Sequence, residues 1–157
     1  MPLSTLVLGL GNLLLGDEGV GVHVAQALMA EGSPEGVVVL DTGTAVLEAL
    51  PELEAAERVI VIDAVKGGKA PGTLYRMPFE AFAKKPVIAS MHGFDLDRVL
   101  ALTERRQPPE VLVLGVEPAT MEYSLELSRE IAAILPSFIE RVKKEIENKN
   151  WLEVKSG

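Results

Sequence analysis

The fold is decided by residues 6–28, which read LVLGLGNLLLGDEGVGVHVAQAL. This stretch opens with a continuous apolar run at 6–10, which is too short for a helix and is typical of a strand covered on both faces. A glycine-rich turn containing Asp17 and Glu18 follows, and apolar residues then recur at helical spacing from Val20 onwards. Strand, turn and helix in this order form the first unit of a parallel α/β sheet.

The same alternation continues along the chain. Further strands are expected at 37–40, 59–62 and 111–116, with a weaker candidate at 73–77, and further helices at 46–53, 96–103 and 127–146. Pro136 lies inside the last helix and is expected to bend or divide it. Together these elements predict an α/β fold, with a mostly parallel sheet and helices on both faces.

The chain length of 157 residues is typical of one domain. We predict a single α/β domain over residues 1–147, and a polar tail over 148–157 that frays. Hydrophobic residues make up 48% of the chain and aromatic residues only 4%, so the core must consist mainly of aliphatic side chains.

Charge and composition exclude several classes of partner and site. The net charge of −8 disfavours nucleic acid and anionic membrane surfaces. Without cysteine, any metal must be bound through oxygen and imidazole. The chain has neither a secretory signal nor an apolar run of about 20 residues, so a cytoplasmic protein without a membrane span is expected.

Acidic side chains and a histidine follow the apolar runs. In parallel sheets the working site lies beyond the carboxyl ends of the strands, which is where Asp17, Glu18, Asp41 and Asp63 are expected, with His92 in a nearby loop. The ordinary alternative for a single acid is helix capping or turn stabilisation. For His23, within the first helix, we expect only a solvated position.

The Gly9-Leu10-Gly11 turn also imitates a dinucleotide-binding fingerprint, with Asp41 at the end of the next strand. Leu14 stands where the third glycine belongs, and Asp17 and Glu18 place negative charge where a pyrophosphate would bind. We therefore expect no NAD or FAD to bind.

The chain resembles the hydrogenase maturation endopeptidases. The motifs that carry the resemblance are residues 9–21 (GLGNLLLGDEGVG), 41–44 (DTGT), 62–64 (IDA), 70–73 (APGT), 90–92 (SMH) and 115–118 (GVEP). Thr42 departs from the usual Asp-Gly-Gly-Thr segment, and Val46 replaces a usual glycine. The resemblance implies a three-layer α/β/α sandwich with a five-stranded twisted sheet.

It also implies a metal site at Glu18, Asp63 and His92, and removal of the C-terminal extension from a nickel–iron hydrogenase large-subunit precursor after nickel insertion. The ion is expected to be nickel carried by the substrate, although the same ligands suit zinc or another divalent ion. Asp17 and Asp41 are candidates for orienting water or the substrate tail. The partner is the large-subunit precursor, and the enzyme is expected to be monomeric. A self-sufficient metal-dependent amide hydrolase and a non-enzymatic metal-binding module are the alternatives.

Overall fold

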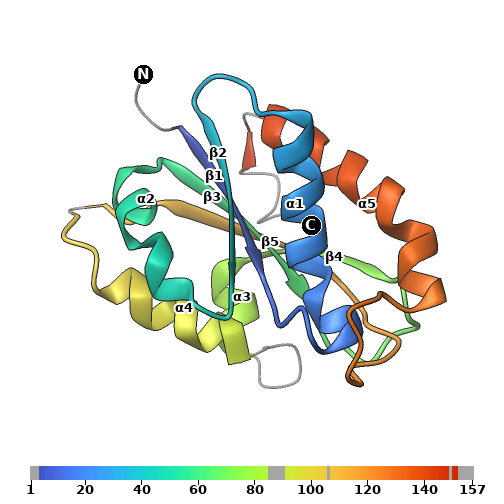
Figure 1. Ribbon diagram of the computed structural model, residues 1–157. Coiled ribbons are helices and arrows are strands. Elements are labelled where there is room, and N and C mark those ends of the chain that lie inside the picture. Colours follow the sequence, from blue (N-terminus) through green and yellow to red (C-terminus); the bar gives the residue numbers. More distant parts are fainter. Residues whose placement is uncertain (1–3, 85–90, 106, 149, 152–157) are drawn as a thin grey trace.

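The structure is a computed structural model that describes residues 4–84, 91–105, 107–148 and 150–151. Its elements follow the predicted alternation of strands and helices (Figure 1). In chain order they are β1 (Thr5–Leu10), η1 (Gly16–Gly19), α1 (Val20–Glu31), β2 (Val37–Gly43), η2 (Val46–Ala49), α2 (Leu50–Ala55), β3 (Arg58–Ala64), β4 (Leu74–Pro78), α3 (Phe79–Lys84), α4 (Met91–Ala101), β5 (Glu110–Val116) and α5 (Arg129–Glu147).

The five strands form one sheet in the order β2-β1-β3-β5-β4. β1, β2, β3 and β5 are parallel, whereas β4 pairs antiparallel with β5. The predicted mostly parallel five-stranded sheet is therefore confirmed, including β4, the strand that the sequence indicated most weakly. Because β4 runs the other way, its first residues lie at the same edge as the carboxyl ends of the other four strands.

Two aliphatic cores cover the two faces of the sheet, which confirms the three-layer arrangement. α1 and α5 lie on one face, and α2, α3 and α4 lie on the other (Figure 1). Along β3, alternate side chains enter alternate cores: Ile60 and Ile62 pack with α1 and α5, whereas Val59 and Val61 pack on the side of α4. The strand alternation thus determines which helix layer each residue at the sheet edge faces.

Two features of the helices add to the sequence prediction. α3 was not anticipated, because its six residues are too few to show helical periodicity. α5 continues through Pro136 as one helix, so of the two effects expected of the proline, bending or division, division does not occur. Buried Ile131, Phe138 and Val142 hold α5 against the sheet on both sides of the proline, so packing compensates for the hydrogen bond that proline cannot make.

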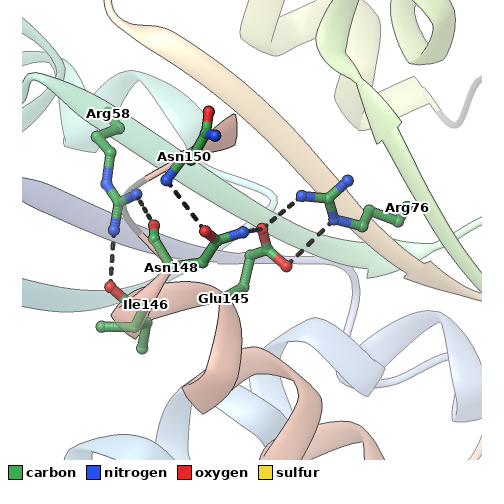
Figure 2. A network of polar contacts seen from close by, with 6 residues as sticks. All are labelled: Arg58, Arg76, Glu145, Ile146, Asn148 and Asn150. Carbon is green, nitrogen blue, oxygen red and sulfur yellow. Dashed lines mark hydrogen bonds and ion pairs between the residues drawn. The ribbon is translucent and has the colours of Figure 1, made fainter. Parts of the chain in front are cut away.

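The C-terminal end of α5 is fastened to the sheet by a polar network (Figure 2). Arg76 donates to both carboxylate oxygens of buried Glu145, at 2.8 and 3.2 Å. Arg58 donates to the backbone carbonyls of Ile146 and Asn148. The guanidinium of Arg58 also lies 4.3 Å from the ring centroid of Trp151.

These contacts show that Asn148, Asn150 and Trp151 do not fray, whereas residues 149 and 152–157 of the predicted tail lie outside the described residues. Trp151 is buried and belongs to the core between the sheet, α1 and α5. Asn148 donates to Glu145 and accepts from the backbone N–H of Asn150. The sequence did not predict these contacts, because residues 148–157 look polar and unpatterned. Their partners also give no signal: Arg58 lies on β3, and Glu145 lies in a charged segment of α5.

Candidate functional site at the carboxyl edge of the sheet

Asp63 lies near the end of the central strand β3 and is fully buried. Its Oδ1 accepts a hydrogen bond of 2.8 Å from the backbone N–H of Ala64. By strand alternation Asp63 shares the face of Val59 and Val61, and therefore projects towards the layer that contains α4. A buried carboxylate at the working edge of a parallel sheet is the strongest single sign of a functional site.

Glu18 is placed beside this edge by the glycine turn after β1. Gly11 has a φ of 130°, and a Cβ there would lie only 2.0 Å from the Glu18 carbonyl oxygen. Gly11 also donates to the carbonyl of Gly43 at the end of β2, at 3.1 Å. Only glycine permits this conformation and approach, so the turn fixes the half-buried Glu18 in η1 at the start of α1.

His92 was expected in a loop, but its backbone lies in the first turn of α4, on the face of the sheet towards which Asp63 projects. The side chain of His92 is outside the described residues. Within the described part, no three His, Asp or Glu side chains are grouped so that they would hold a metal ion. The ligand set of Glu18, Asp63 and His92 therefore stays a prediction.

Asp17 is fully buried, and its carboxylate accepts three backbone hydrogen bonds from a distant loop. Oδ2 accepts from Ala119 at 2.8 Å and from Thr120 at 3.1 Å, and Oδ1 accepts from Ser128 at 2.7 Å. This geometry favours the structural alternative for Asp17, in which the carboxylate holds the loop before α5 in place.

Asp41 and His23 occupy different surroundings from Asp63. Asp41 is exposed and accepts a 3.2 Å hydrogen bond from Gln26 of α1, so it lies on the opposite face of the sheet from Asp63. This contact favours a stabilising role for Asp41 as well.

The expectation that His23 is solvated is wrong. Its ring is half-buried, and Nε2 is buried without a hydrogen-bond partner among the described residues. Burial lowers the pKa of the His23 imidazole, and the charge of Asp17 opposes this only in part. The single apolar stripe of α1 did not reveal that this side of the helix is also covered.

Glu117 is a buried acid at this edge that was not recognised as a site residue. Its Oε1 accepts from the Tyr75 hydroxyl at 2.5 Å and from the backbone N–H groups of Gly67 and Lys69 at 2.8 and 3.1 Å. Burial alone would raise the pKa of Glu117, but these hydrogen bonds outweigh it and lower the pKa. Burial and the Glu117 carboxylate raise the pKa of Tyr75 to about 12. Glu117 thus binds the loop after β3 to β4, and only its position directly after β5 signals this role in the sequence.

The carboxyl edge of the sheet combines a buried acid, a glycine turn that fixes a second acid, and a helix with a histidine in its first turn. This arrangement is typical of α/β enzymes, in which the site lies beyond the carboxyl ends of the parallel strands. Comparison with known proteins gives the family. The family model described as hydrogenase maturation protease matches residues 22–145. The chain belongs to the hydrogenase maturation protease family.

Individual relatives agree with this assignment. The chain is 36% identical to the hydrogenase expression/formation protein HupD of Rhodobacter capsulatus, over 99% of this chain and 77% of that protein. It is 38% identical to HupM of Azotobacter chroococcum mcd 1, and spans 59% of the length of that relative. Among solved structures it superposes on the hydrogenase maturating endopeptidase HybD of E. coli with a TM-score of 0.79 and 30% identity, over 92% of both chains.

Proposed function

We propose that this protein is an endopeptidase that removes the C-terminal extension of a nickel–iron hydrogenase large-subunit precursor after nickel has been inserted. Family membership supports the class of reaction. The observation that carries the proposal is Asp63, a buried carboxylate at the carboxyl edge that projects towards the layer of α4. A carboxylate at this edge, where parallel α/β proteins bind their ligands, is suited to contact a cationic group of the substrate.

In this proposal the nickel is part of the substrate and enters with the precursor. Glu18 and Asp63 would offer carboxylate oxygens and His92 an imidazole nitrogen, a donor set that suits nickel as well as zinc. When bound, the ion supplies Lewis acidity towards the scissile carbonyl or its attacking water. The residues themselves bind and orient the precursor. Recognition of the metal would ensure that only a completed precursor is cut.

The test is incubation with a nickel-loaded large-subunit precursor, scored by mass for loss of the tail. We expect Glu18→Gln to lower the cleavage rate at least about a hundredfold, because several kcal/mol of transition-state stabilisation depend on correct seating of the ion. His92→Gln should fail similarly. Glu48→Gln, a change of the same type at an exposed residue of η2, should process normally.

Melting curves separate chemistry from folding in this experiment. Glu18 is only half-buried in a turn, so the Glu18→Gln protein should melt within about 2 °C of the parent. Near-normal cleavage by this variant with unaltered melting would show that the site has been assigned to the wrong residues. Failure of the parent protein to cut any nickel-loaded precursor would refute the proposed activity itself.

A further inference from the structure

Three large apolar side chains are exposed on two neighbouring backbone segments beside the candidate site. Leu14 is 57% exposed, Tyr123 88% and Leu125 62%. Scattered apolar residues are common on protein surfaces, but a group on contiguous backbone marks an interaction surface. We call Leu14, Tyr123 and Leu125 the apolar patch.

The backbone beneath the apolar patch is fixed by hydrogen bonds. Ser124 donates to the carbonyl of Leu14 and accepts from the N–H of Gly16, each at 2.9 Å, and Leu15 and Ser124 form a parallel bridge. The buried Asp17 carboxylate anchors both ends of the same loop through Ala119, Thr120 and Ser128. The patch is therefore presented in a preorganised form, which reduces the entropy cost of binding a partner.

The charged residues within the two segments that carry the apolar patch are all acidic. Glu122 and Glu126 are exposed within the loop, and neither residues 11–18 nor residues 119–128 contain Lys or Arg. A partner surface with basic residues around an apolar depression would be complementary in charge. Since Leu14 lies four residues before Glu18, a partner seated on the patch would also reach the candidate site.

We infer that the apolar patch is the docking surface for the folded body of the large-subunit precursor. This inference rests on the proposed function and extends it from the cleaved tail to the body of the substrate. Tyr123 stands out from the surface, and an exposed aromatic side chain of this kind inserts into a pocket on a folded partner. The partner surface is apolar at its centre and rimmed by Arg or Lys side chains.

The test is steady-state cleavage of the nickel-loaded precursor by the full chain carrying Tyr123→Ala and Leu125→Ala. KM should rise at least tenfold, equal to about 1.4 kcal/mol of binding free energy, while kcat stays within about twofold. A second variant with Glu122→Lys and Glu126→Lys should raise KM and reduce its dependence on salt. The matched control, Met29→Ala with Leu102→Ala, removes two exposed apolar side chains at the opposite edge of the sheet and should leave KM unchanged.

Each outcome is informative. Saturable cleavage by the parent with the same KM in the Tyr123 and Leu125 variant would overturn the inference and leave the proposed function intact. No cleavage by the parent would overturn the proposed function. A concentration-dependent dimer in sedimentation, abolished by the same two substitutions, would assign the patch to a second copy of this chain and so overturn the inference.

Discussion

Asp17 illustrates how one side chain connects distant parts of the chain. Both carboxylate oxygens accept backbone N–H groups from residues more than 100 positions later in sequence, and the side chain is fully buried. In Asp17→Asn, one oxygen becomes an NH2 group, which cannot accept a hydrogen bond. At least one buried N–H is then left unpaired, and we expect the free energy of unfolding to fall by about 2 kcal/mol.

Urea denaturation measures this change, with Asp41→Asn as its control. Asp41 is exposed and has a single long hydrogen bond to Gln26, so its substitution should change stability by less than about 0.5 kcal/mol. Equal stabilities for the two variants would mean that the three amides do not depend on the charge of Asp17.

For individual residues, the sequence predicts where a residue lies in the fold better than it predicts the burial and contacts of its side chain. Asp63 and Glu18 lie at the sheet edge as expected, because residues after parallel strands must gather there. The sequence could not predict the partners of Asp17, since they lie on a loop that folds back from beyond β5, nor the burial of His23, which depends on tertiary packing. His92 as a ligand stays a prediction.

The packing of α1 on the sheet is unusually close. A Cβ on Gly21 would lie 2.1 Å from the carbonyl oxygen of Ile62 and 2.3 Å from that of Leu10, and a Cβ on Gly9 would lie 2.3 Å from the carbonyl oxygen of Gly21. The helix backbone therefore rests directly on β1 and β3. This contact fixes how far the preceding turn lies from the sheet, and therefore where Glu18 lies.

Gly21→Ala tests this contact between elements. In an ordinary helix interior the change would stabilise by up to about 1 kcal/mol, because alanine is the better helix former. Here the methyl group must displace backbone atoms, so we expect a net loss of at least about 2 kcal/mol in thermal or urea unfolding. Ala30→Gly, at an exposed position of α1, measures the effect of the Ala–Gly difference in helix propensity without a change in packing. Stabilisation by Gly21→Ala would contradict the close packing.

At the level of elements, length determined what the sequence could predict. Continuous apolar runs located all four parallel strands, although only β1, β3 and β5 are buried on both faces or nearly so, and β2 at the sheet edge is mostly half-buried. α3 is too short to show a period, and the outcome at Pro136 depended on contacts on either side that only the tertiary structure supplies. The motifs of the first turn were the most informative, because their spacing is imposed by backbone geometry at Gly11.

Across the whole molecule, the C-terminal network joins α5 to β3 and β4 through Arg58 and Arg76 (Figure 2). Glu145 is buried, which by itself raises its carboxyl pKa, but the hydrogen bonds and charge of Arg76 outweigh burial and lower the pKa below its usual value. A depressed carboxyl pKa contributes stability above the pKa of the unfolded chain, which is about 4.3 for Glu. That contribution is lost as the pH falls through the pKa of the folded state.

Glu145→Gln should therefore destabilise the protein in a pH-dependent way. Gln keeps the shape but leaves Arg76 without its charged partner, and we expect a loss of about 1–3 kcal/mol at pH 7. The difference from the parent should shrink on acidification below about pH 4, because the parent protonates Glu145 and loses the same interaction. Thermal unfolding from pH 7 to pH 3 measures this convergence. Glu147→Gln, at an exposed residue in the last turn of α5, should stay within about 0.5 kcal/mol of the parent throughout this range. A constant gap between Glu145→Gln and the parent across this range would show that the charge of Glu145 is not what holds the end of α5 to the sheet.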